Sequence, residues 1–143
     1  ANTCVVQGVK KGENPELTTF WVVLGYPPCS VAIPAWVKAA NENSFLLIKS
    51  ADSYNSPMCD KALALKSEVF PITRGNGDKY LNFSRLYNSN GTGFIQRIAP
   101  LEEKIFEISN KKIDEWRKKG IVSSDMKALI KEISTHIEKN FPE

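Results

Sequence analysis

The feature that most restricts the fold of this sequence is an apolar repeat in its last third. The repeat consists of Phe94, Ile98, Leu101, Ile105, Ile108, Ile113 and Trp116, mostly three or four residues apart. This spacing is typical of an amphipathic helix that buries one face. Burying five such side chains contributes about 10 kcal/mol, whereas ordering the backbone costs about 1–2 kcal/mol per residue. The helix therefore needs a partner surface.

The charges within this repeat agree with a helix and with its direction. Acidic side chains come early and basic ones late, as the helix dipole favours; they are Glu102, Glu103 and Glu107, then Lys111, Lys112, Arg117, Lys118 and Lys119. Gly120 is the expected end. Pro100 leaves two starts open, because it fits either the repeat itself or the first turn of a helix that follows an extended segment at residues 94–98.

A second helix is predicted over residues 124–141. Its apolar stripe is Met126, Leu129, Ile130, Ile133, Ile137 and Phe141. Ser123 or Ser124 is placed to cap its start, since serine oxygens accept hydrogen bonds from free backbone amides there. The link to the preceding helix is short, so the two helices should pack as an antiparallel pair.

The first third of the chain predicts strands. Residues 3–9 and 17–25 are rich in β-branched and aromatic side chains, and the short polar gap between them indicates an antiparallel hairpin. Residues 30–37 predict a further short strand, interrupted by Pro34. The apolar residues do not alternate with polar ones. We therefore expect a sheet that is covered on both faces.

The middle of the chain predicts one helix. Pro57 fits a first helical turn, and residues 58–69 place apolar side chains between charged ones. Residues 74–79 indicate a glycine-containing turn, and residues 80–87 fit either a helix or a strand. The fold class is therefore α+β, with residues 1–143 forming a single domain or the C-terminal segment of a larger domain.

Composition excludes several classes of function. The 19 Lys and Arg against 16 Asp and Glu leave a net charge of only +3, which does not favour nucleic acid or an anionic membrane as a partner. No apolar run approaches the roughly 20 residues that span a bilayer. The opening residues lack the features of a signal peptide, and the compartment stays open.

The residues that carry chemistry do not form a recognisable set. Cys4, Cys29 and Cys59 have spacings that match no zinc pattern, so we predict no metal and no cofactor. One disulfide or three buried thiols both remain open. Cys4 is fourth in the chain, too far from a terminal amine for that amine to activate it. His136, the only histidine, has no acid or nucleophile near it in sequence. No catalytic residue is therefore predicted.

Two tryptophans are the candidates for a substrate pocket. Trp21 and Trp36 flank the proline-containing stretch YPPCSVAIPAW. Large aromatic side chains in such a position line pockets for apolar acyl or aromatic groups. Packing in the core is the alternative, because both residues lie in strand-like segments.

Three stretches of the sequence resemble a known family of enzymes. They are CVVQGVKKGENPELTTFWVVLGYPPCSVAIPAWV, KALALKSEVFPITRGNGDKYLNFSRLY and APLEEKIFEISNKKIDEWRKKG. Together they are similar to the C-terminal portion of bacterial linear-amide hydrolases related to acyl-coenzyme A:isopenicillin N acyltransferase, which belong to the N-terminal-nucleophile superfamily. The phrase TTFWVVLGYPPCSVAIP resembles the late strands of the four-layer αββα fold of that family.

The resemblance implies a role for this chain within a larger enzyme. Such enzymes use a cysteine exposed at a new N-terminus by self-cleavage, with its own amine as base. No position of this sequence matches that cysteine, and Ala1 is no nucleophile. We therefore expect the nucleophile on an upstream segment of the same parent, with a small acylated amine as the parent's substrate. Export of the parent from a bacterial cytoplasm and self-association into a homo-oligomer are left open.

A second hypothesis belongs to a different class of function. In it the chain is a self-contained, non-catalytic binding or interaction domain whose strands are covered by its two C-terminal helices. A broad exposed sheet face favours the incomplete enzyme, whereas a chain without one favours the self-contained domain.

Overall fold

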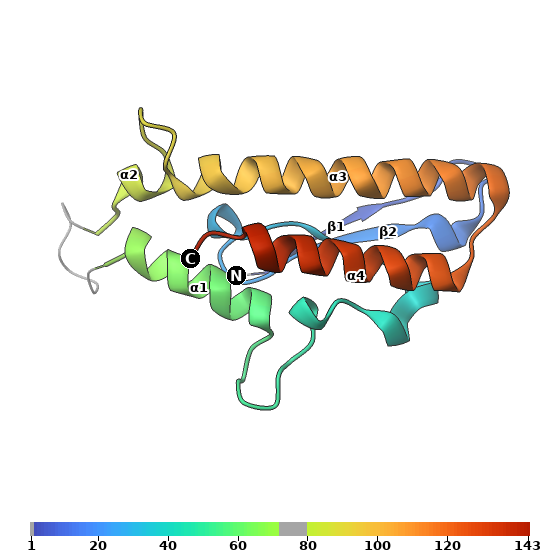
Figure 1. The fold of residues 1–143 in the computed structure, drawn as a ribbon, viewed down its shortest axis with the longest axis horizontal. Helices are drawn as coiled ribbons and strands as arrows, with labels where there is room; N and C mark the ends of the chain where they lie inside the picture. The colour runs from blue at the N-terminus through green and yellow to red at the C-terminus, as the bar shows by residue number, and fades with distance from the viewer. Residues whose placement is uncertain (1, 72–79) are drawn as a thin grey trace.

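We describe the fold from a computed structural model, which covers residues 2–71 and 80–143. A three-stranded antiparallel sheet comes first in the chain, and helices follow it. The two longest helices lie side by side against the sheet (Figure 1). This confirms the predicted α+β class and the antiparallel helix pair. The turn predicted at residues 74–79 lies outside the described residues.

The sheet has the order β1-β2-β3, in which β1 is Thr3–Gln7, β2 is Thr19–Val23 and β3 is Ile33–Ala35. β1 and β2 form the predicted hairpin. β3 is the predicted third strand, and it pairs with β2 even though Pro34 stands at its centre. Four short 3-10 helices connect these elements to the rest of the chain; they are η1 Pro15–Leu17, η2 Pro27–Cys29, η3 Val37–Glu42 and η4 Phe45–Leu47.

The long helix α3 spans Phe94–Lys119 and ends at Gly120, whose positive φ of 88° suits glycine. The alternative of an extended segment at residues 94–98 is wrong, because the helix already begins at Phe94 and contains Pro100. A proline inside a helix costs about 3 kcal/mol. Burial of Phe94 and Ile98 offsets this cost, at about 1.5–3 kcal/mol for each side chain.

The last helix, α4, spans Ser123–Asn140 and buries the predicted apolar stripe. The predicted serine cap is wrong. Val122 occupies the cap position, and no side chain caps the helix there. Ile121 packs against the core just before this point, so packing of the link sets where the helix starts. Asp125 in the first turn still interacts favourably with the helix dipole.

Two shorter helices come between the sheet and α3 in the sequence. The helix α1, Pro57–Val69, is capped by Ser56, whose hydroxyl accepts a hydrogen bond from the backbone amide of Cys59. This confirms the predicted middle helix and its first-turn proline. Residues 80–87 contain the short helix α2, Phe83–Leu86, so the helical alternative is correct for part of that segment.

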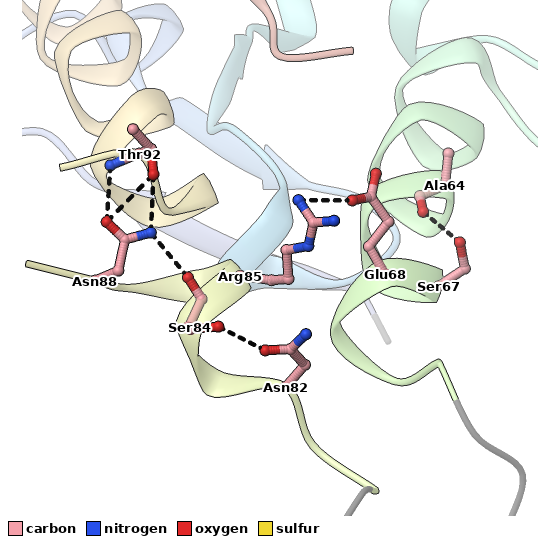
Figure 2. A network of polar contacts seen from close by, with 8 residues as sticks. All are labelled: Ala64, Ser67, Glu68, Asn82, Ser84, Arg85, Asn88 and Thr92. Carbon is pink, nitrogen blue, oxygen red and sulfur yellow. Dashed lines mark hydrogen bonds and ion pairs between the residues drawn. The ribbon is translucent and has the colours of Figure 1, made fainter. Parts of the chain in front are cut away.

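Asn88 organises the loop between α2 and α3. Its side-chain oxygen accepts hydrogen bonds from the backbone amides of Asn90 and Thr92. Its amide group donates to the backbone oxygen of Ser84, and Figure 2 shows this bond together with the one from Thr92. The same view shows Arg85 of α2 reaching Glu68 of α1 at 3.4 Å. These contacts tie α2 to the elements before and after it.

Gly93, at the end of this loop, leaves no room for a side chain. A Cβ atom there would lie 2.3 Å from the backbone oxygen of Leu86. The Gln96 side chain instead bridges the close-packed backbone, because its oxygen accepts hydrogen bonds from the amides of Asn88 and Gly93. The start of α3 is thereby held against the end of α2.

Candidate functional site

The two faces of the sheet differ in their cover. Directly opposed residues of antiparallel strands share a face, so Thr19 and Trp21 lie on one face and Phe20 and Val22 on the other. The first two are buried and the second two are only half-buried. The expectation of cover on both faces is therefore not met over β1, where both faces are exposed, and on β2 the face of Phe20 and Val22 is less buried than the face of Thr19 and Trp21.

We call the second face the open face. It consists of the half-buried Phe20, Val22 and Ala35 with the exposed Cys4 and Val6 opposite them on β1. Ile33 shares this face but is buried, so the face is open over β1 and β2 and closes at β3. No charged residue belongs to it. An uncharged, partly exposed sheet face of this kind is typical of a surface that packs against another element.

The covered face holds both candidate pocket residues. The Trp21 ring packs edge-on against Phe106 of α3, with the ring centroids 4.8 Å apart. The Trp36 ring packs in the same way against Trp116, with the centroids 5.5 Å apart, and its Nε1 donates a hydrogen bond to Thr19 Oγ1 at 2.8 Å. The structure thus places Trp21 and Trp36 in the core. Their role as the lining of a substrate pocket stays a prediction.

A hollow of about 420 Å³ lies at the end of the open face. Its lining consists of Pro15, Glu16, Thr18, Phe20, Val37 and Lys38. Phe20 precedes one candidate tryptophan, and Val37 follows the other. Successive residues of a strand point to opposite sides, so Phe20 faces away from the buried Trp21. Val37 begins η3 directly after the buried Trp36 and is exposed. For Phe20, the alternation along β2 is the sequence signal that would have found it.

An ion pair stands at the rim of this hollow. Lys38 Nζ lies 2.7 Å from a carboxylate oxygen of Glu16. The hydrogen bond from Lys38 lowers the pKa of the Glu16 carboxyl, and a hydrogen bond from Asn14 lowers it further. The hollow therefore combines apolar walls with one cation and one anion that largely neutralise each other. This chemistry suits an apolar group more than a strongly charged ligand.

The cysteines occupy three different environments. All three are free: Cys4 is exposed, Cys29 is buried and Cys59 is half-buried. The prediction of three buried thiols is therefore wrong for Cys4. Burial, and then the nearby charge of Glu68, raises the pKa of the Cys29 thiol to about 11, which keeps it protonated. A protonated, buried thiol is a poor nucleophile.

The only histidine does not complete a catalytic set. His136 lies in α4, and its ring is 3.3 Å from the side-chain amide of Asn140. Within residues 2–71 and 80–143, no hydrogen bond joins a cysteine to His136. The same part of the chain contains no group of three or more His, Cys, Asp or Glu side chains that could hold a metal ion.

The outer surface of the helix pair carries a second hollow, of about 370 Å³. Its lining is dominated by lysines and acidic residues of α3 and α4. Four of these side chains form two ion pairs, Lys104 with Glu107 at 2.9 Å and Lys112 with Glu115 at 3.0 Å. Because the charges compensate each other, this surface is most simply a solvated one. None of the described helices is both long enough and apolar enough to cross a membrane.

The fold and the open face define the class of this protein as an α+β chain whose sheet is covered by helices on one face and open on the other. Comparisons with models of protein families, with curated proteins and with solved structures found no match.

Proposed function

We propose that this chain is the C-terminal structural part of a cysteine amide hydrolase or acyltransferase of the N-terminal-nucleophile type. In this proposal the nucleophilic cysteine lies on an upstream segment of the same parent, and the parent acts on a small acylated amine. The observation that carries the proposal is the open face of the sheet. The resemblance of residues 4–37, 61–87 and 99–120 to such enzymes supplies the reaction class.

The arrangement of layers supports this role. In an αββα fold, each sheet has helices on its outer face and a second sheet on its inner face. Here α3 covers one face, where Phe106 packs on Trp21, as an outer layer would. The other face offers Val6, Phe20 and Val22 to a second layer. A sheet with one such face left open is what one half of a four-layer sandwich requires.

The hollow supports a contribution to the substrate site. Phe20 and Val37 give it apolar walls beside the open face, where a second sheet would enclose it. An acyl chain is the part of an acylated amine that such walls suit. Trp21 and Trp36 support this wall indirectly, because each is buried in the core directly beside Phe20 or Val37 in the chain. The thiol and amine that break the amide bond come from the upstream segment.

Activity on a panel of acylated amines tests the proposal. We would compare this chain alone, the cysteine-led upstream segment alone, and the two mixed or fused. Activity only when both are present is the expected result. Activity of this chain alone that is lost in Cys4→Ala would refute the proposal and make Cys4 the nucleophile. An upstream reading frame without a cysteine-led segment would refute it as well.

Two matched variants test the open face in the same assay. Val22→Lys places a charge on the half-buried open face, and we expect it to prevent assembly and activity. Val122→Lys places the same charge on the exposed link before α4, and we expect it to leave both unchanged. Equal activity of the two variants would show that the open face is not a contact with the parent.

A self-contained interaction domain is the second candidate. The observation that favours it is a continuous core, in which β2, β3 and the four helices contribute buried side chains to one cluster. This candidate predicts that the chain folds and stays monomeric and compact without any upstream segment. A chain that folds only when that segment is present would exclude it.

A further inference from the structure

The two edges of the sheet are unlike. β3 forms one edge, where Pro34 has no backbone N–H to donate, and α4 contacts this strand. β1 forms the other edge, and all five of its residues, Thr3–Gln7, are exposed. They include no proline and no charged side chain. Natural edge strands usually carry prolines or charged side chains, which prevent pairing with another chain. β1 has neither.

We propose that the free edge of β1 pairs antiparallel with β1 of a second copy of this chain, across a two-fold axis. The two sheets then form one continuous sheet. This inference concerns the edge of the sheet and does not rest on the proposed function, which concerns its open face. Strand addition at a free edge is a common mode of recognition, in which backbone hydrogen bonds supply the affinity.

The sequence of β1 is complementary to itself in this arrangement. A register centred on Val5 pairs all five residues of the strand. It sets Val5 opposite Val5, Cys4 opposite Val6 and Thr3 opposite Gln7, so that apolar residues meet apolar ones and polar residues meet polar ones. A two-fold interface requires this kind of self-complementarity. The pairing also joins the two open faces, because opposed residues share a face.

The charges of the chain are compatible with the same register. The chain carries a net charge of +3, so two copies repel each other unless their lysines stay apart. Lys10 and Lys11 follow β1 and fall outside the five paired positions, and no charged residue opposes another within them. A five-residue ladder is smaller than the interfaces of stable dimers, which bury at least about 1,000 Å². We therefore expect a weak, reversible dimer.

Sedimentation velocity of the full chain under reducing conditions, from about 10 µM to 1 mM, tests the proposal, because a small interface is expected to be weak. Wild type should show a concentration-dependent dimer. Val5→Lys sets two like charges directly opposite each other, at a site 56% exposed in one copy, and should weaken dimerisation at least about tenfold. Val37→Lys, at a site 72% exposed outside β1, is the control and should dimerise like wild type. Circular dichroism checks that each variant is folded.

The register has its own test. In Val6→Cys, the new thiol of one copy faces Cys4 of the other, so mild oxidation should give a covalent dimer on a non-reducing gel. Val37→Cys is the matched control and should give none. Three results would overturn the proposal. They are a wild type that stays monomeric at 1 mM, a Val5→Lys variant that dimerises like wild type, and an assembly with the upstream segment that contains one copy of this chain and is broken by Val5→Lys.

Discussion

The covered and open faces of the sheet are built from the same strands, yet their side chains have different surroundings. On β2, Thr19 and Trp21 are buried, with Trp21 packed on Phe106 of α3, whereas Phe20 and Val22 are only half-buried. The covered face adds aromatic contacts and a buried hydrogen bond to Trp36. Within residues 2–71 and 80–143, the open face has neither. The same strand can therefore stabilise the fold through the side chains of its covered face, while the side chains of its open face remain available for assembly.

The largest effect should come from truncating the covered side. Trp36→Ala removes a side chain that is 1% exposed and packs on Trp116, so we expect a loss of about 3–5 kcal/mol in the free energy of unfolding. Val37→Ala, one residue further along, removes an exposed side chain and should change it by less than about 0.5 kcal/mol. Urea denaturation measures both. Equal losses would show that the two sides do not differ in stability.

Thiol labelling should separate the open face from the buried core by rate. The pKa of Cys29 is raised to about 11 by burial and by the charge of Glu68, which lowers its thiolate fraction about 100-fold relative to a thiol of pKa about 9. Cys4 is exposed on the open face. Under native conditions we expect iodoacetamide to modify Cys4 at least about 100 times faster than Cys29. Peptide mass spectrometry over time measures both rates, and similar rates would contradict the assigned burial.

A smaller effect is expected from the buried hydroxyl of Thr19 on the covered face. Thr19→Val keeps the shape of the side chain but removes the acceptor for Trp36 Nε1 and the donor to the backbone oxygen of Leu17. The unpaired indole N–H should then cost about 1–3 kcal/mol in the free energy of unfolding. Thr19→Ser retains the hydroxyl and serves as the control, with a smaller loss. If the valine variant were as stable as wild type, the two hydrogen bonds of the Thr19 hydroxyl would contribute nothing to the stability of the covered side.

The smallest effect should be found on the open face itself. Val6→Ala truncates a side chain that is 58% exposed, so the free energy of unfolding should change by less than about 0.5 kcal/mol. Ile33→Val removes less volume but lies where the same face closes, at 1% exposure, and should cost about 0.5–1.5 kcal/mol. Denaturant melts at low protein concentration measure both. The opposite order would mean that the open face is packed over β1.

Local patterns predicted most of the elements. The apolar repeat of α3, the stop at Gly120 and the first-turn proline of α1 are each properties of neighbouring residues, and the structure confirms them. The hairpin follows in the same way from two β-branched segments and a short gap. The sequence interpretation was wrong where a distant contact decides. The buried Phe94 stabilises the helical residues that precede Pro100. Ile121 packs against the core, and α4 begins after Val122 and not after a capping serine.

The candidate site was predicted in part. The segments that hold Trp21 and Trp36 do lie next to the hollow, but the residues that line it are their neighbours Phe20 and Val37. The choice between the two faces of a strand depends on which side the helices cover. Every position of β2 except Thr19 is apolar, so the pattern alone does not distinguish the faces.

The sequence by itself determined the kinds of element, their approximate ends and the α+β class, because helix and strand periods, caps and turns depend on residues close together in the chain. Only the tertiary structure decided which face of the sheet is covered and which edge is free. It also decided which thiol is buried and which residues line the hollow. These properties depend on where α3 and α4 pack against strands about 70 or more residues away in sequence, as the hydrogen bond from Ala32 to Glu102 illustrates, and no local period specifies such contacts.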